Sequence, residues 1–277
     1  MNRREWLALC AAGAAVAQDT GKVQRKGRLK QGVCKGVFGR GVQLEDMCKH
    51  AQRLGIVGID LTPPQEFAML KKYGLIPTMG SGAMTLTGGC NRKEDHPQVE
   101  KAMLELIDAS AEAGVPNVIA LSGNRRGMPD KEGQDNVVAF LQKVKNRAEE
   151  KGVTICLELL NSKVNHPDYQ CDRTSWGVEV CKRVNSPRVK LLYDIYHMQI
   201  MEGDIIRTIR DNLAWIGHFH TAGNPGRHEM DDSQEMNYRG IARAIADLPY
   251  TGYVSHEYSP LKDPLKSLEE TLAIFDV

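Results

Sequence analysis

The sequence lacks a surplus of charge of either sign, since its 277 residues contain 36 Lys and Arg against 35 Asp and Glu. A dedicated nucleic-acid surface would need a clear basic excess, so we expect no nucleic-acid partner. Internal repeats and low-complexity blocks are also missing, and 42% hydrophobic with 26% charged residues is the composition of an ordinary globular protein. Intrinsic disorder, a collagen-like chain and a polytopic membrane protein are therefore excluded.

Cysteines in tight pairs are missing too. The seven cysteines are scattered along the chain, which excludes a disulfide framework and a zinc ribbon. Six of them follow residue 17, and several fall in segments that we predict to be strands or helices. We therefore expect these six to be mostly free, buried thiols.

Long hydrophobic runs are absent, and one short run lies at the N-terminus. Arg3 and Arg4 precede a nearly uncharged stretch that ends in Ala15-Val16-Ala17. Its apolar part is too short for a membrane helix, which needs roughly 20 residues, so we expect no stable membrane insertion. A basic start, an apolar middle and small residues at a cleavage point predict a twin-arginine-type export signal at residues 1–17. A periplasmic or exported protein is expected, or a cytoplasmic one if the signal is not used.

Short apolar segments alternate with amphipathic ones from residue 30 onward, after a basic segment at residues 18–29 that we interpret as a linker. The apolar segments are brief, rich in Val, Ile or Leu and bounded by Gly, Pro or Asn, as buried parallel strands are. Helical patterns fill the intervals, as in the apolar face made by Leu44, Met47 and Ala51. The eight predicted strands are 31–37, 57–61, 76–79, 117–121, 154–159, 190–194, 215–220 and 253–257.

This alternation predicts a parallel sheet with right-handed crossovers. Eight such units have the size of a closed (β/α)8 TIM barrel, which is typically about 250 residues long. An open doubly wound sheet would show fewer units and a glycine-rich phosphate turn, but Gly36, Gly39 and Gly41 lack the dinucleotide-binding spacing. We therefore predict an α/β fold in which residues 30–277 form one TIM-barrel domain.

Polar residues stand at the ends of four consecutive predicted strands in the second half of the chain. They are Glu158, Asp194, His220 and Glu257, separated by 36, 26 and 37 residues, so that each interval fits one βα unit. In a TIM barrel the C-terminal strand ends converge at the mouth, where active sites form. Any one acid alone could instead cap the following helix. His218 could also be the histidine of the site in place of His220. Four residues in register nevertheless favour a shared site.

Three carboxylates at one point would repel one another unless a cation neutralised them. Three carboxylate ligands and one imidazole suit a divalent ion of hard to borderline character. We therefore predict one divalent metal ion held by Glu158, Asp194, His220 and Glu257, with Mn²⁺ first and Mg²⁺, Co²⁺ or Zn²⁺ as alternatives. His218 would help to position His220 without binding the metal ion itself.

Several runs in the C-terminal half resemble the hydroxypyruvate isomerase family. That family belongs to the xylose isomerase-like (sugar phosphate isomerase/epimerase) TIM-barrel superfamily, together with the ketose 3-epimerases. The resemblance extends in element order over residues 30–277. The most specific runs are Leu157-Glu158-Leu159-Leu160-Asn161, Asp194-Ile195-Tyr196-His197-Met198-Gln199 and Pro225-Gly226-Arg227-His228-Glu229.

The resemblance implies a divalent-metal-dependent isomerase of a small hydroxy-carbonyl compound or sugar, acting in carbohydrate metabolism. It carries the family's four metal ligands over to the four strand-end residues, and places its substrate-binding histidine and arginine at His197 and Arg227. Together with the position of their strands, it assigns proton transfer to Glu158 and Glu257, through a metal-bound cis-enediolate.

One position departs from the hydroxypyruvate isomerases, where the third metal ligand is a glutamine. His220 is the residue that the 3-epimerases carry, so a ketose 3-epimerase is one alternative. A lyase acting on 3-keto-glycosides is another, because the same chemistry can expel a neighbouring group and an exported enzyme would meet extracellular sugars. A noncatalytic sugar-binding module would more typically show two similar domains around a hinge. The expected partner is a small-molecule sugar or hydroxy-keto acid, and homo-oligomerisation stays open.

Overall fold

The computed structural model describes residues 22–277. Within these residues, eight strands form one parallel sheet in the order β3-β2-β1-β8-β7-β6-β5-β4. The predicted export signal at residues 1–17 and the start of the predicted linker at 18–29 lie outside the described residues. The strands are β1 (Lys30–Cys34), β2 (Gly58–Asp60), β3 (Ile76–Pro77), β4 (Asn117–Ala120), β5 (Thr154–Glu158), β6 (Val189–Asp194), β7 (Ile216–Thr221) and β8 (Tyr253–His256).

The two outer strands of this order, β3 and β4, are joined through Gly80. Its N–H donates to the carbonyl of Asn117 over 2.8 Å, and its carbonyl accepts the N–H of Ile119 over 3.0 Å. A β-carbon at position 80 would lie 2.9 Å from the Ser110 hydroxyl, so this close approach favours glycine. The predicted (β/α)8 barrel is confirmed.

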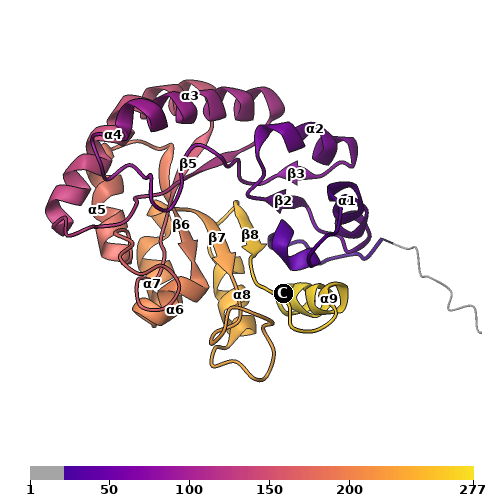
Figure 1. Ribbon diagram of the computed structural model, residues 1–277. Coiled ribbons are helices and arrows are strands. Elements are labelled where there is room, and N and C mark those ends of the chain that lie inside the picture. The colour runs from indigo at the N-terminus through magenta and orange to yellow at the C-terminus, as the bar shows by residue number, and fades with distance from the viewer. Residues whose placement is uncertain (1–21) are drawn as a thin grey trace, which may run out of the picture.

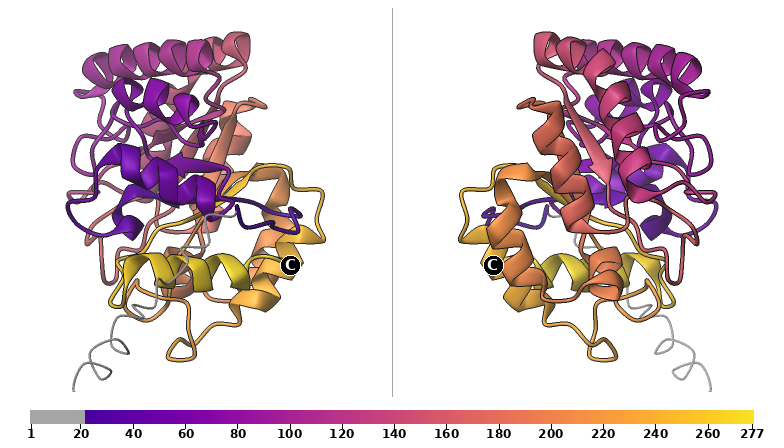
Figure 2. Two further views of the ribbon diagram at one scale, coloured as in Figure 1. Left: turned by 90° about the vertical axis from the view of Figure 1, so that its right-hand side faces the viewer. Right: turned by 90° about the vertical axis from the view of Figure 1, so that its left-hand side faces the viewer.

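Helices cover the outside of the sheet (Figure 1), and two side views show the strands running between them (Figure 2). Their apolar faces turn inward; α1, for example, buries Met47, Cys48 and Ala51. The α-helices of the described part are α1 (Leu44–Arg53), α2 (Pro64–Lys72), α3 (His96–Ala113), α4 (Asp130–Lys151), α5 (Thr174–Val184), α6 (Ile195–Met201), α7 (Ile205–Asn212), α8 (Tyr238–Ala246) and α9 (Pro264–Ile274). Two 3₁₀ turns, η1 (Lys35–Phe38) and η2 (Leu213–Trp215), accompany them.

Six of the eight predicted strands run too far at their C-terminal ends. The 76–79, 117–121, 154–159 and 253–257 predictions end one or two residues too late, and the other two bear on the site. The 31–37 prediction is wrong beyond Cys34, because η1 begins there and buries Val37 through a turn instead of through the sheet. The 57–61 prediction overshoots by one residue, because β2 ends at Asp60 and Leu61 adopts a φ of 51°. Cys34 and Asp60 are therefore the residues that end these strands.

The described chain agrees with the expectation that the cysteines are free and buried. The six cysteines between residues 22 and 277 are all free and buried. The end of the predicted linker is tied to α1, because the N–H of Val23 donates to the carbonyl of Arg53 and the Arg25 side chain donates to that of Leu54. Over the same residues, none of the helices combines the length and apolar character that crossing a bilayer requires.

Candidate metal centre and active site

The four predicted metal ligands meet at the C-terminal end of the barrel. Glu158 ends β5, Asp194 ends β6, His220 lies near the end of β7, and Glu257 follows β8 directly. One ligand atom from each lies within 4.8 Å of the others. Asp194 and His220 are register partners on neighbouring strands, so their side chains point to the same side of the sheet.

The alternation of side chains along β8 turns Glu257 toward this cluster. Its neighbour His256 is buried on the opposite side, where its ring packs against Phe275 at 5.0 Å and its Nε2 lies 3.0 Å from Gln31 Oε1. The N–H of Glu257 donates to the carbonyl of Thr221 over 2.9 Å, so the backbone ladder reaches this residue. Because successive side chains of a strand point to opposite faces, the Glu257 carboxylate faces inward.

These residues fit a divalent cation. Asp194 Oδ1 accepts the N–H groups of residues 196 and 197 and so caps α6, while Asp194 Oδ2 is buried without a hydrogen bond. His220 Nδ1 also lacks a hydrogen bond, and it lies 3.0 Å from Glu257 Oε2 and 3.6 Å from Glu158 Oε1. Buried polar atoms normally have partners, and a cation bound by all four residues would supply them.

The electrostatics of the cluster lead to the same conclusion. Burial raises the pKa of Glu158, and it raises the pKa of Asp194 to about 7. Burial also opposes the charge of Glu257, but His220 and Arg227 outweigh it and lower the pKa of this carboxyl. Carboxyl groups that resist joint ionisation are expected where a bound cation balances their charge.

Asp60 is a member of the site that the sequence interpretation missed. It ends β2, is fully buried, and places its Oδ2 2.6 Å from His218 Nε2 and 3.3 Å from His220 Nε2. Burial opposes its charge, yet the two histidines hold its pKa well below the usual range. Because this carboxylate accepts the Nε2 proton of His220, it leaves His220 Nδ1 free to bind a metal ion. His218 reaches His220 through the same carboxylate.

Replacing Asp60 by asparagine is therefore expected to weaken Mn²⁺ binding by about 10- to 100-fold. A neutral amide is a weaker acceptor for the Nε2 proton and holds the His220 ring less firmly. Competition dialysis measures the affinity, and His256→Gln is the control, because His256 is a buried histidine whose ring packs against Phe275. An Asp60→Asn protein with normal Mn²⁺ affinity would refute this positioning role.

His197 of α6 faces the cluster as a neutral donor. Asn161 Oδ1 accepts the backbone N–H groups of Val164 and Asn165, so its Nδ2 donates to His197 Nδ1 over 2.5 Å. The ring proton of His197 therefore sits on Nε2, which is buried, lacks a hydrogen bond and lies 3.6 Å from Asp194 Oδ2. Burial lowers the pKa of His197 well below its usual range.

Arg227 approaches the cluster from the loop after β7. Its guanidinium lies 2.9 Å from Glu257 Oε2 and 3.8 Å from Asp194 Oδ2, and it sits over the Tyr196 ring at 5.7 Å. The backbone of Arg227 adopts a φ of 57°, in the left-handed region that side chains other than glycine rarely occupy. Such strain is common at functional sites, where the surroundings hold a side chain in one direction.

Two cavities meet at the cluster and share Arg227 and Glu257 among their lining residues. One, of about 280 Å³, extends to Cys34. The other, of about 370 Å³, contains Glu158 and His166, and most of its remaining wall is apolar. Together they offer the volume of a small-molecule site beside Glu158 and Glu257, two of the predicted ligands.

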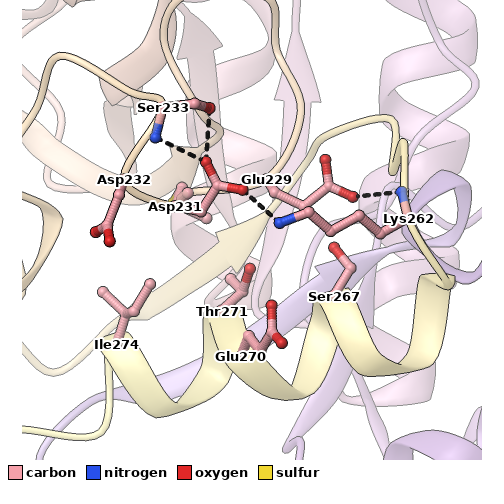
Figure 3. Close-up of a pocket in the computed structure, with 10 residues that line it drawn as sticks. Glu229, Asp231, Asp232, Ser233, Lys262, Ser267, Glu270, Thr271 and Ile274 are labelled. Carbon is pink, nitrogen blue, oxygen red and sulfur yellow. Dashed lines mark hydrogen bonds and ion pairs between the residues drawn. The ribbon is translucent and has the colours of Figure 1, made fainter.

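A third cavity, of about 420 Å³, lies between the 229–233 loop and α9 (Figure 3). Two of its acids are already engaged, since Glu229 accepts the N–H groups of Leu261 and Lys262, and Asp231 pairs with the Lys262 ammonium at 2.5 Å. None of its lining residues belongs to the metal cluster. Although it is larger than either cavity at the barrel mouth, it plays no part in the site.

Comparison with known sequences places the chain in one family of TIM barrels. Residues 38–276 match the family described as Xylose isomerase-like TIM barrel. The chain is 37% identical over 115 residues to 2-oxo-tetronate isomerase from Cupriavidus necator, covering 42% of this chain and 44% of that protein. It is 35% identical over 105 residues to hydroxypyruvate isomerase from Escherichia coli, covering 37% and 40%. The chain spans about half the length of the curated relatives it matches.

Solved structures share the fold. AP endonuclease, family 2, from Brucella melitensis superposes with a TM-score of 0.77 at 23% identity, covering 87% of this chain and 96% of that one. The 3-keto-D-glucoside 4-epimerase of E. coli gives 0.76 at 20% identity, covering 89% and 98%. The IOLI protein with a bound zinc atom gives 0.68 at 14% identity, covering 89% and 95%. At these identities the likeness establishes the barrel alone.

Proposed function

Because this chain belongs to the xylose isomerase-like TIM barrel family, we propose that it is a divalent-metal-dependent isomerase of a small hydroxy-carbonyl compound or sugar. The names of its relatives, 2-oxo-tetronate isomerase and hydroxypyruvate isomerase, support this class of reaction and substrate. The observation that carries the proposal is the cluster of Glu158, Asp194, His220 and Glu257, whose ligand atoms lie within 4.8 Å of one another.

These four residues would hold the metal, which is Mn²⁺ in our proposal because carboxylates dominate the ligand set. Mg²⁺, Co²⁺ and Zn²⁺ are the alternatives. When bound, the ion would polarise a substrate carbonyl and the neighbouring hydroxyl, which makes the adjacent C–H bond more acidic. One structural neighbour contains a bound zinc atom, which supports metal binding in this fold.

Glu158 and Glu257 would transfer the proton. Glu158 ends β5 and Glu257 follows β8. These strands lie three apart in the sheet, and both residues line the cavity of about 370 Å³. A substrate between them would meet one carboxylate on each face of the planar intermediate that forms when the carbon next to the carbonyl loses its proton. Return of the proton to the neighbouring carbon is isomerisation, and return to the opposite face of the same carbon is epimerisation.

His197 and Arg227 would hold the substrate oxygens. The buried Nε2–H of His197 can donate to one oxygen without adding charge, and the Arg227 guanidinium can hold a carboxylate or hydroxyl groups through two N–H donors. His166 is a third candidate that the sequence interpretation missed. Its Nε2 is buried without a partner, and the residue lines the same cavity as the two glutamates.

Solvent-deuterium incorporation followed by NMR tests the proposal. The full chain, loaded with Mn²⁺, is incubated in deuterated water with hydroxypyruvate, free ketoses or 3-keto-glycosides. We expect deuterium next to a carbonyl group in one of these compounds and none after the metal is removed. A loaded protein that exchanges none of the three classes would contradict the proposed chemistry for them.

A ketose 3-epimerase is the second candidate, and His220 supports it because the resemblance assigns a histidine at this position to the 3-epimerases. The products of the deuterium experiment separate the candidates. An isomerase moves the carbonyl, an epimerase inverts one carbon and keeps the carbonyl in place, and a lyase acting on 3-keto-glycosides releases a second product.

Asn161→Asp is expected to lower turnover by about 10²-fold, because an aspartate accepts the proton of His197 Nδ1 and leaves Nε2 without one. The substrate oxygen then loses its donor while the shape of the site is kept. Nitrogen NMR of the His197 ring measures the tautomer directly, and Asn165→Asp is the control in the same loop. Normal turnover with a reversed tautomer would show that His197 donates nothing to the substrate.

We also propose that residues 1–17, which lie outside the described residues, direct export through the twin-arginine pathway. Replacing Arg3 and Arg4 together by lysine is expected to retain the protein in the cytoplasm, because the pathway reads the arginine pair. Fractionation of cells that express the full chain measures this. A double variant found in the periplasm at the wild-type level would exclude this signal type.

A further inference from the structure

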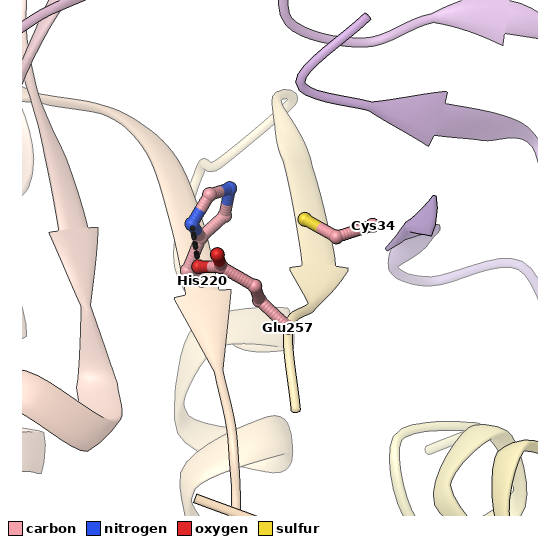
Figure 4. Close-up of side chains that lie close together, drawn as sticks. All are labelled: Cys34, His220 and Glu257. Atoms are coloured by element: carbon pink, nitrogen blue, oxygen red, sulfur yellow. Dashed lines mark ion pairs between the residues drawn. The ribbon is translucent and has the colours of Figure 1, made fainter. Parts of the chain in front are cut away.

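The thiol of Cys34 points toward His220 and Glu257 from β1, a strand that supplies none of the four predicted ligands (Figure 4). Its Sγ, one ring nitrogen of His220 and one carboxylate oxygen of Glu257 lie within 4.8 Å of one another. We propose that these three form a second, softer ligand set, through which thiophilic ions such as Zn²⁺, Cd²⁺ and Co²⁺ bind to sulfur. The inference rests on the proposed metal centre and adds a residue to it.

The sheet holds Cys34 beside Glu257. β1 and β8 pair in register with Val33 opposite His256, so the next residues along the two strands are Cys34 and Glu257. The Cys34 side chain is 6% exposed, its thiol is free, and it lines the cavity of about 280 Å³. A small ion can therefore reach a sulfur atom that otherwise has no covalent partner.

A second observation indicates that these atoms can bind a ligand. His220 is completely buried, and its Nδ1 lacks a hydrogen bond. A thiolate, an imidazole and a carboxylate, with one position left open, form a ligand set that zinc accepts. With bonds of about 2.0–2.3 Å, ligand atoms around a tetrahedral ion lie about 3.5 Å apart, so small side-chain movements within the 4.8 Å cluster complete the site.

The two ligand sets compete, because both use His220 and Glu257. A hard ion such as Mn²⁺ binds more tightly when Glu158 and Asp194 are among its ligands, whereas a soft ion binds more tightly to the sulfur of Cys34. Binding to Cys34 forms one sulfur–metal bond and releases the thiol proton to water, without a change of oxidation state. The identity of the ion would therefore decide which of these strand-end residues act as its ligands.

Absorption of the Co²⁺-loaded full chain tests the inference. Thiolate bound to Co²⁺ gives an intense near-ultraviolet charge-transfer band, whereas oxygen and imidazole ligands give weak visible bands. We expect the intense band in the wild-type protein and its loss in Cys34→Ser, with the visible bands kept. Two control variants, Cys90→Ser and Cys10→Ser, should keep the band. Cys90 is a buried thiol that belongs to none of the potential ligand groups of the described residues.

Competition dialysis gives a second readout, and Cys34→Ala replaces Cys34→Ser if the serine variant does not fold. Loss of the sulfur should lower Zn²⁺ affinity by about tenfold or more and leave Mn²⁺ affinity nearly unchanged. Visible bands without a charge-transfer band in the wild-type protein would overturn the role of Cys34 but leave the proposed metal centre intact. Absence of cobalt binding altogether would overturn both.

Discussion

Replacing Glu257 by glutamine is expected to lower turnover by about 10³-fold or more while the barrel stays folded. The carboxylate is ion-paired with Arg227 at 2.9 Å and lies 3.0 Å from His220 Nδ1, and these two residues lower its pKa, so it is held in place and kept ionised. An amide of the same shape can neither accept nor return the substrate proton. The measurement is the turnover number and the rate of solvent-deuterium exchange, both at saturating Mn²⁺.

The glutamine also removes a proposed metal ligand, so the manganese content of the variant is measured in the same samples. If the variant still binds the metal but no longer exchanges deuterium, the loss of activity is due to the loss of proton transfer. Glu66→Gln is the control, because Glu66 pairs with Lys35 at 2.6 Å on α2, outside the cluster. A Glu257→Gln protein that retains both metal and normal exchange would show that Glu257 is not the base.

The fold and most of the proposed metal ligands follow from local signals in the sequence. Glu158 and Asp194 each end an apolar run of Val, Ile and Leu, and a parallel barrel brings the ends of such runs to one mouth. Spacing by whole βα units then places residues far apart in the chain next to one another. No knowledge of side-chain contacts is needed for this step.

Cys34 and Asp60 could not be predicted in the same way, because their strands end where the apolar pattern does not. Val37 and Phe38 continue the apolar run after Cys34, but a 3₁₀ turn buries them. Leu61 likewise follows Asp60 and hides the end of a strand of only three residues. A signal was present, since Asp60 ends β2 after Gly58-Ile59 as Asp194 ends β6, but strand ends are the least certain part of such a prediction.

The hydrogen-bonded partners of the site residues could not be predicted from the sequence, for another reason. Asp60 is 158 residues from His218, and Asn161 is 36 residues from His197. Neither pair shows a sequence period, because one joins opposite sides of the barrel and the other joins a loop to a helix. Only the folded geometry reveals that Asp60 orients His220 and that Asn161 fixes the proton of His197.

Removing the metal is expected to abolish turnover and to lower the melting temperature, and the second effect should grow with pH. At a metal concentration 100 times its Kd, binding stabilises the protein by about 2.7 kcal/mol. For a domain of this size that corresponds to a shift of roughly 5–10 °C. The physical reason is that three carboxyl groups, two of them on buried residues, share one small volume with His220.

The sign of the pH dependence follows from Asp194, whose pKa burial raises from 3.8 to about 7. A carboxyl group whose pKa is raised on folding favours the folded state at low pH, and this contribution is lost as pH rises from about 4 through 7. Glu158, with its raised pKa, acts in the same direction. Metal binding displaces these protons, so the Mn²⁺-induced rise in melting temperature should be larger at pH 8 than at pH 5.5. Calorimetry with and without a chelator measures it, and an equal or larger rise at pH 5.5 would mean that the ion binds away from these carboxyl groups.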